Sequence, residues 1–256
     1  MFKYAAVTGS GMGQGKNEDR VMVCGNYLSD GELSGESSGA FLAIVCDGVG
    51  GEDFGAEAAG VSAMSFMNLC GKKMSLFDLS GAVFNANDVL LGFRALQGNM
   101  FTTLAGLYID DVHYCAFNAG DTRIYQKMGK RLIQLSTDHI RTEGLMDKVG
   151  SEMPSYVITS YLGGLESKCS PSIKYGESRL NSGGKYMLCT DGVHGVMSDE
   201  EILIILGKPR PLIDRCRMIY NKAIMNNSFD NTSIVLVENA KILERAYAIT
   251  KGANLT

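Results

Sequence analysis

The sequence is poor in proline and histidine and has no runs of basic residues. It contains only 4 prolines against 31 glycines in 256 residues, which favours tight turns over extended linkers. Its 3 histidines do not cluster and its 7 cysteines form no C-x-x-C pair, so nothing indicates a zinc site. The net charge is −4. The chain therefore has neither a nucleic-acid-binding nor a membrane-binding charge pattern.

Long apolar runs are also missing. The first residues, MFKYAAVTGSG, contain no apolar stretch of signal-peptide length. No other run approaches the roughly 20 residues that a membrane-spanning helix needs. The odd number of cysteines and the lack of a C-x-x-C pair fit a reducing compartment. We therefore expect a cytoplasmic protein that does not associate with membranes.

The chain does contain enough apolar residues for a large core. Hydrophobic residues make up 45% of it and charged residues 20%, which is not the composition of a disordered chain. The length allows one large domain or two small ones. The sequence has no internal repeat. The polar stretch 29–39 lies between two strand candidates, so it is predicted to be a hairpin loop rather than a domain boundary.

Apolar periodicity predicts strands and helices in blocks rather than in strict alternation. Strand patterns cover the ranges 4–8, 20–24, 41–46, 103–109, 112–118, 123–127, 131–135, 173–177, 186–189 and 232–237. Helical patterns cover 52–71, 76–96, 198–206 and 211–225, and a helical tail follows residue 237. Consecutive strands with short links indicate antiparallel sheets, so we predict an α+β fold in which helices cover packed sheets. The stretch 139–170 has a mixed pattern and receives no assignment.

Two of the strand patterns end at the same tripeptide, Asp-Gly-Val, at 47–49 and 191–193. Glycine has no side chain, so the backbone after each aspartate can approach a ligand closely. A buried carboxylate without a partner is costly or becomes protonated. Either a cation neutralises these aspartates, or the strands end at the surface in contact with water.

Three further acidic sites lie at strand ends. Asn17-Glu18-Asp19 precedes a strand, Asp121 lies in a turn between two strands, and Asp230 precedes the last strand. Acidic sites without histidine or cysteine partners indicate oxygen ligation of Mg²⁺ or Mn²⁺. Aspartate and asparagine are also common turn residues, so turn chemistry is the simpler explanation of any one site taken alone.

The acidic sites belong to a longer series of motifs. In chain order it reads NEDR (17–20), CDGVGGEDFGAEAA (46–59), TTLAG (102–106), NAGDTRIY (118–125), LSTDH (135–139), VITSYLGG (157–164), LCTDGVHGVMSDEEI (188–202) and DNTSIVLV (230–237). This series resembles the metal-dependent serine/threonine protein phosphatases, the PPM or type 2C family, in its bacterial branch. The resemblance implies one domain over residues 1–256 with a four-layer α-β-β-α sandwich, in which helices flank two packed antiparallel sheets. It also implies a flap beside the site at about 139–170 and a helical tail at 240–256.

The resemblance implies a pair of Mg²⁺ or Mn²⁺ ions at one end of the sandwich. Asp47 would bridge the two ions, and Asp191 with Asp230 would hold one of them. Asp19 and its neighbour would act near the other ion, partly through water, and Asp121 would serve a possible third ion together with Asp191. The implied ligands are Asp19, Asp47, Gly48 through its carbonyl, Asp191 and Asp230, with Glu18 and Asp121 as further candidates.

The implied reaction is the hydrolysis of phosphoserine or phosphothreonine on proteins. A water that bridges the two ions becomes hydroxide near neutral pH and attacks phosphorus in line. No side chain acts as nucleophile, so the carboxylates supply binding and geometry. The resemblance further implies a monomeric signalling enzyme that acts on phosphoproteins and counteracts a serine/threonine kinase.

The chain departs from the family pattern at three positions. Gln14 stands where the family usually has a phosphate-binding arginine, Gly195 where it often has an aspartate for the third ion, and Val49 where some relatives have an acid. The nearest cation to the first of these is Lys16, which is a point charge rather than a bidentate fork. The candidate substrate contacts are Lys16, Gln14 and Asn231.

These departures leave two alternatives open. One is a weak or inactive pseudophosphatase that serves as a binding or regulatory module. The other is a phosphatase that acts on a non-protein phosphoester. His139 and His194 are expected to have surface or structural roles, and Arg123 is expected to be a structural partner of a carboxylate.

Overall fold

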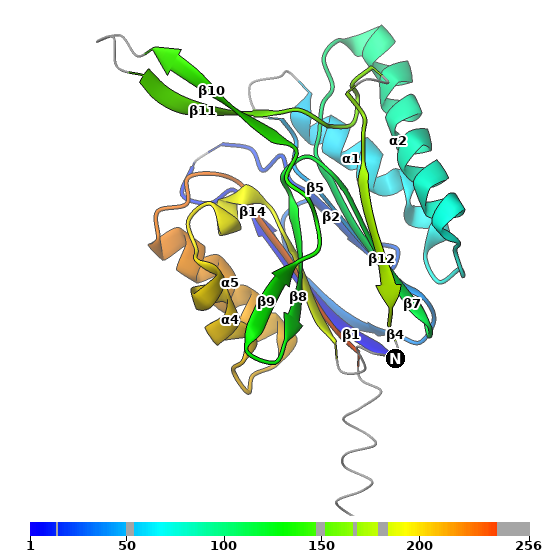
Figure 1. Cartoon of the computed structure of the whole chain (residues 1–256), viewed down its shortest axis with the longest axis vertical. Coiled ribbons are helices and arrows are strands. Elements are labelled where there is room, and N and C mark those ends of the chain that lie inside the picture. Colours follow the sequence, from blue (N-terminus) through cyan, green and yellow to red (C-terminus); the bar gives the residue numbers. More distant parts are fainter. Residues whose placement is uncertain (14, 50–53, 147–151, 166–167, 179–183, 240–256) are drawn as a thin grey trace, which may run out of the picture.

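Two six-stranded antiparallel sheets stack face to face at the centre of the structure (Figure 1). The computed structural model describes residues 1–13, 15–49, 54–146, 152–165, 168–178 and 184–239. The first sheet has the strand order β4-β1-β14-β13-β8-β9, with the bounds Gly31–Ser37, Phe2–Gly9, Thr232–Asn239, Lys185–Cys189, Arg123–Met128 and Arg131–Gln134. The second sheet has the order β12-β7-β6-β5-β2-β3, with the bounds Ser172–Glu177, His113–Ala119, Leu104–Ile109, Phe41–Cys46, Arg20–Val23 and Asn26–Leu28.

Continuous apolar strands are needed because the second sheet is buried on both faces. In β5, Leu42 and Ile44 face the helices, whereas Phe41 and Val45 face the first sheet. Successive side chains of a strand point to opposite faces, so a strand covered on both sides must be apolar at every position. This explains why the run FLAIVC has no polar residue.

Helices cover the outer face of each sheet (Figure 1). The helices α1 (Gly55–Ser65) and α2 (Leu76–Gln97) pack on the second sheet, and α4 (Asp199–Leu206) and α5 (Leu212–Met225) pack on the first. Capping boxes begin α2 at Ser75 and α4 at Ser198, the latter as predicted. Three buried apolar layers result, which confirms the predicted four-layer α-β-β-α sandwich. None of the described helices combines the length and the apolar character that crossing a bilayer requires.

A separate hairpin projects beyond the two sheets (Figure 1). Its strands are β10 (Ile140–Met146) and β11 (Glu152–Ile158), which pair only with each other among the described residues. The hairpin lies within 139–170, for which the periodicity made no assignment. Both of its faces lack the regular apolar alternation of a strand that packs on a core, so the sequence carries no clear strand signal there.

The prediction of a hairpin loop over 29–39 is wrong, because Gly31–Ser37 forms the edge strand β4. It pairs with β1 along its whole length, and Leu33 packs on the layer between the sheets. A side chain at Gly35 would collide with the Tyr4 ring, so the small residues of this strand fit beneath an aromatic neighbour. An edge strand needs little apolar sequence, which is why the polar composition was misleading.

The remaining differences are smaller. The helix predicted over 52–71 is α1 followed by the 3₁₀ turn η1 (Met67–Leu69), and its expected first residues lie outside the described part of the chain. The second Asp-Gly-Val opens the one-turn helix α3 (Asp191–His194). The predicted helical tail at 240–256 also lies outside the described residues.

Candidate metal centre

Strand register brings the first two acidic sites together. Asp19 directly precedes β2 and Asp47 directly follows β5, and these strands pair antiparallel with Arg20 opposite Cys46. The start of one strand therefore lies beside the end of the other, and the two aspartates are neighbours at one edge of the second sheet. Their carboxyl groups lie within hydrogen-bonding reach of each other.

The first sheet brings three further acidic residues to the same end. Cys189 of β13 pairs with Arg123 of β8 and with Ile234 of β14. Asp191, Asp121 and Asp230 lie in the segments that adjoin these three positions, so they share one edge. Because the sheets pack face to face, the two groups of aspartates lie near each other. Burial raises the pKa of Asp47, and the charges of all four other aspartates raise it further.

Four of these carboxylates lie in an environment that disfavours their charge. Asp19 has no exposed surface. Burial raises its pKa to about 6, although hydrogen bonds from Ser233 and Thr190 oppose the shift. Burial, followed by the charges of neighbouring aspartates, raises the pKa of Asp191 to about 7 and that of Asp47 well above its ordinary value. Burial also raises the pKa of Asp121.

The cluster has carboxylate oxygens without partners. The buried Oδ1 atoms of Asp19 and Asp191 accept no hydrogen bond within the described part of the chain. Oδ2 of Asp19 accepts one from the hydroxyl of Thr190 at 2.9 Å. None of the ion pairs between described residues involves any of the five aspartates. Such uncompensated acidic oxygens are the ligands that hard divalent cations take.

The acidic side chains of the described residues do not converge on a single point in this structure. Within the described ranges, no group of three His, Cys, Asp or Glu side chains lies close enough to hold an ion. A bound cation would have to draw the carboxylates of Asp47, Asp191 and Asp230 closer together. The residues present fit divalent cations by their chemistry, because every donor is a carboxylate or carbonyl oxygen.

Two threonines that the sequence reasoning did not single out hold the backbone of Asp47. The amide of Thr103 and the hydroxyl of Thr102 both donate to the carbonyl oxygen of Asp47 at 2.8 Å. The amide of Asp47 donates in turn to the Thr103 hydroxyl at 3.1 Å, and that hydroxyl lies 2.6 Å from the Thr122 hydroxyl. The TTLAG motif was the signal available for these residues, although nothing local distinguishes it from any strand beginning with threonine.

The glycines of the two Asp-Gly-Val segments are explained by close chain packing. A side chain at Gly48 would collide with the carbonyl oxygen of Gly55, and one at Gly192 with that of Asn231. The sequence reasoning attributed these glycines to close approach of a ligand. In the structure, the approaching group is the protein's own backbone.

The asparagine after Asp230 supports the first acidic segment. The side-chain oxygen of Asn231 accepts a hydrogen bond from the backbone amide of Glu18 at 2.8 Å. Burial raises the pKa of Glu18. Oδ1 of Asp230 accepts a hydrogen bond from the amide of Asn231 at 2.8 Å, so this carboxylate also caps its own turn. The expected turn chemistry and the convergence of charges therefore coexist at this position.

Lys16 and Arg123 form ion pairs with carboxylates other than the five aspartates. Lys16 pairs with Glu57 at 2.9 Å on the exposed surface, and Gln14 falls outside the described residues. Arg123 pairs with Asp138 at 2.6 Å, which confirms its predicted structural role. His194 lies 3.1 Å from the carbonyl oxygen of Asp121, and His139 accepts a hydrogen bond from the Gly120 amide, so both histidines make structural contacts.

Comparison with known proteins identifies sequence relatives of this chain and solved structures with a similar fold. No family model matches the chain. The serine/threonine protein phosphatase PstP of Mycobacterium tuberculosis is 25% identical over 251 residues, which cover 93% of this chain and 45% of PstP. The protein phosphatase PhpP of Streptococcus pneumoniae is 29% identical over 155 residues, which cover 57% of this chain and 61% of PhpP. The chain thus spans less than two thirds of the length of these relatives.

Solved structures share the fold. A crystal structure of PstP superposes with a TM-score of 0.76 at 22% identity, covering 93% of this chain and 99% of that one. Another, of the PstP catalytic domain in complex with 2 manganese ions, has a TM-score of 0.71 at 22% identity and covers 93% and 97% of the two chains. The chain is therefore similar in sequence to the bacterial serine/threonine protein phosphatases PstP and PhpP, and it shares the fold of the solved PstP structures.

Proposed function

We propose that this chain hydrolyses phosphoserine and phosphothreonine esters on proteins with the help of two divalent ions, Mn²⁺ or Mg²⁺. The observation that carries the proposal is the meeting of five aspartates from both sheets, two of which have a buried oxygen without a partner. The names of PstP and PhpP as protein phosphatases support it, as does the PstP structure with 2 manganese ions. No observation on the described residues favours a pseudophosphatase.

The position of each aspartate suggests its part in binding the ions. Asp47 interacts electrostatically with aspartates of both groups. It therefore lies between the two sets of carboxylates, as a ligand shared by two ions would have to. Asp191 and Asp230 would hold one ion from the first sheet, and Asp19 would act near the other from the second. The full ligand set that we propose is Asp19, Asp47, Asp191 and Asp230 with the Gly48 carbonyl, joined by Glu18 and, for a third ion, Asp121.

When bound, two divalent ions offset the charge of a dianionic phosphomonoester and lower the pKa of a bridging water. The chain's own residues hold the ligands in place. Thr102 and Thr103 fix the backbone of Asp47, and Thr190 orients the Asp19 carboxylate. Asn231 fixes the backbone of Glu18 and remains a candidate substrate contact. Lys16 would reach a phosphate only by leaving Glu57, and Gln14 stays a prediction.

We also propose the setting in which this activity operates. The chain would act as a single domain and as a monomer, with phosphoproteins as substrates, and would counteract a serine/threonine kinase in a cytoplasmic signalling system. Protein phosphatase relatives support phosphoprotein substrates. The flap would be formed by the hairpin of β10 and β11, which lies within residues 139–170.

Phosphate release in the presence of Mn²⁺ tests the proposal. The native protein should release phosphate from p-nitrophenyl phosphate and from a phosphothreonine peptide, and an Asp191→Asn variant should lose the activity. Asp88→Asn removes an exposed carboxylate from α2, far from the centre in the sequence, and should behave like the native protein. Equal rates for the native and Asp191→Asn proteins would contradict the proposed centre.

A further inference from the structure

An apolar groove is lined in part by Val49, which follows Asp47 by two residues. Its volume is about 390 Å³, within the range of about 300–1,000 Å³ that ligand pockets occupy. None of its lining residues carries a charge, in contrast to the acidic cluster. The groove is lined by Val49, Phe101, Tyr156, Val157, Ile158 and Tyr161.

The floor of the groove is tied to the segment that carries Asp47. The amide of Val49 donates to the carbonyl oxygen of Phe101 at 3.0 Å. Isolated bridges join Gly48 to Thr102 and Thr102 to Leu162, so three chain segments are fixed side by side. Phe101 meets Tyr161 edge-on with ring centroids 5.1 Å apart. Groove and aspartate therefore keep a fixed relation to each other.

The ring of Phe101 is also held on a second side. The guanidinium of Arg94 lies 4.7 Å from its centroid, and this arginine donates to the carbonyl oxygen of Gly163 at 3.1 Å. A cation over an aromatic face stabilises the ring's position. The floor is thus preformed, and binding would not have to order it.

The wall of the groove comes from the projecting hairpin. Tyr156 and Val157 of β11 are 67% and 37% exposed, although the ring of the first and the whole side chain of the second are apolar. The base of the hairpin is fixed by a hydrogen bond of 2.7 Å from the Thr159 amide to the His139 carbonyl oxygen. Exposed apolar side chains gathered over a groove mark a binding surface.

We propose that this groove binds a bulky apolar side chain of the phosphoprotein substrate, about two residues from the phosphorylated residue. Val49 follows Asp47 by two residues, which places this lining residue of the groove at most about 7 Å along the chain from the proposed bridging ligand. An extended substrate advances about 3.3–3.6 Å per residue, so the same distance corresponds to two substrate positions. The inference rests on the proposed phosphatase activity, because the phosphate at the metal centre sets the register of the peptide.

Paired phosphothreonine peptides test the inference. Each pair differs only in leucine against serine, at the second residue before or the second residue after the phosphothreonine. The native protein should hydrolyse the leucine peptide of at least one pair with a kcat/KM about tenfold higher, since apolar pockets discriminate by about 10- to 200-fold per group. Ratios near one in both pairs, from a protein that hydrolyses p-nitrophenyl phosphate, would overturn the groove while leaving the proposed function intact.

Variants on the hairpin separate the groove from the metal centre. Tyr156→Ala should bring the leucine-to-serine ratio close to one, whereas Tyr156→Phe should keep it because the ring is retained. Phe77→Ala removes an aromatic ring that is 86% exposed at the start of α2 and should keep the native ratio. A ratio that Tyr156→Ala leaves unchanged would overturn the proposal.

A binding measurement covers the case in which no activity is found. If the native protein with Mn²⁺ releases no phosphate from p-nitrophenyl phosphate, the proposed function fails. The fluorescently labelled peptides are then compared by anisotropy. A tenfold tighter Kd for a leucine peptide, lost in Tyr156→Ala, would uphold the groove, and equal Kd values would overturn it. If the native protein were a dimer and Tyr156→Ala dissociated it, the groove would instead bind a second copy of the chain. That result would also overturn the proposal.

Discussion

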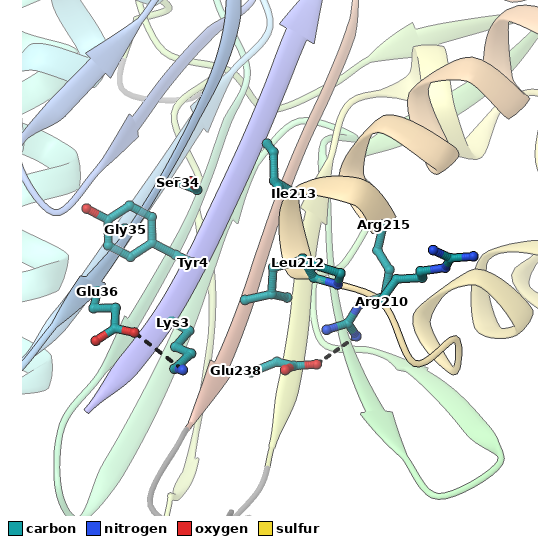
Figure 2. Close-up of a pocket in the computed structure, with 11 residues that line it drawn as sticks. Lys3, Tyr4, Ser34, Gly35, Glu36, Arg210, Leu212, Ile213, Arg215 and Glu238 are labelled. Carbon is teal, nitrogen blue, oxygen red and sulfur yellow. Dashed lines mark ion pairs between the residues drawn. The ribbon is translucent and has the colours of Figure 1, made fainter.

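The two ends of the sandwich differ in how acidic side chains are compensated. One end holds the five aspartates from both sheets, which form no ion pair with a cationic side chain among the described residues. The other end holds a cavity of about 410 Å³ between β1, β4 and the start of α5, where Lys3 pairs with Glu36 and Arg215 pairs with Glu238 (Figure 2). The strand β14 joins the two ends over about 20 Å, at about 3.3 Å per residue.

The pKa values of Glu238 and Asp191 shift in opposite directions. Burial opposes the charge of Glu238, yet ion pairs with Arg215 and Lys185, each at 2.7 Å, hold its pKa below the ordinary glutamate value. Burial and neighbouring negative charges raise the pKa of Asp191 to about 7. Cationic side chains thus compensate the charge of Glu238, whereas the five aspartates form no ion pair among the described residues. This contrast is the strongest physical argument for a metal centre.

Removing a carboxylate from the aspartate cluster should have the largest effect. We expect Asp47→Asn to lower Mn²⁺-dependent phosphatase activity by at least about 100-fold, the upper range for losing even an indirect partner of a metal ligand. Without metal, the same variant should be more stable by on the order of 2 kcal/mol because it relieves a buried, repelled charge. Activity assays and thermal melts in EDTA measure the two effects. A variant less stable than the native protein in EDTA would contradict the contrast between the two ends.

Breaking the paired end should reduce stability instead of activity. Arg215→Ala leaves Glu238 buried with Lys185 as its remaining partner and removes the hydrogen bond to the Leu206 carbonyl. The expected loss is about 3 kcal/mol in urea unfolding, because a largely buried carboxylate then keeps only one of its two cationic partners. The rate per folded molecule should not change. Arg210→Ala is the matched control, since this exposed arginine lines the same cavity without an ion pair among the described residues, and it should cost less than about 0.5 kcal/mol.

The stability contributions of the two ends should change in opposite directions with pH. Folding raises the pKa values of Asp19 and Asp191 to about 6 and about 7. The folded state therefore keeps protons that the unfolded chain has lost, and their contribution to stability falls as pH rises from about 4 to 7. Asp191→Asn removes part of this loss, so its melting temperature relative to the native protein should rise over the same range, by about 2–4 °C per kcal/mol.

Metal should reverse this loss. Mn²⁺ should raise the native melting temperature more at pH 8 than at pH 5, because the ionised carboxylates are the metal-binding form. An equal increase at both pH values would argue against carboxylate ligation. The structural end behaves oppositely in acid: the lowered pKa of Glu238 means that its contribution to stability is lost as pH falls.

The smallest effect is expected at Lys16. Its pair with Glu57 is exposed on both sides, so Lys16→Ala should change stability by less than about 0.5 kcal/mol. If Lys16 contributes a point charge to the substrate phosphate, the variant should raise KM for a phosphopeptide about threefold and leave kcat unchanged. An unchanged KM would remove Lys16 from the candidate substrate contacts. Glu57→Gln serves as control, because it frees Lys16 without removing its charge.

Local sequence determined most of the secondary structure. The strand at Phe41–Cys46 has the predicted bounds, and the capping box at Ser198 begins α4 as predicted. Apolar periodicity and capping depend on residues within a few positions of each other, so they can be recognised without tertiary information. The motif series also indicated the family and its sandwich before any contact was known.

Only the tertiary structure decided which polar segments pair and where the acidic residues meet. The polar strand β4 exists because β1 offers it an edge, and no local pattern distinguishes it from a loop. Asp19 and Asp47 are neighbours because β2 and β5 pair in one register, and they meet Asp191 because two sheets stack. Register and stacking are set by burial of residues far apart in the chain. The acidic motifs can therefore be recognised in the sequence. Their clustering, which creates the uncompensated negative charge, exists only in the folded chain because the residues come from distant segments.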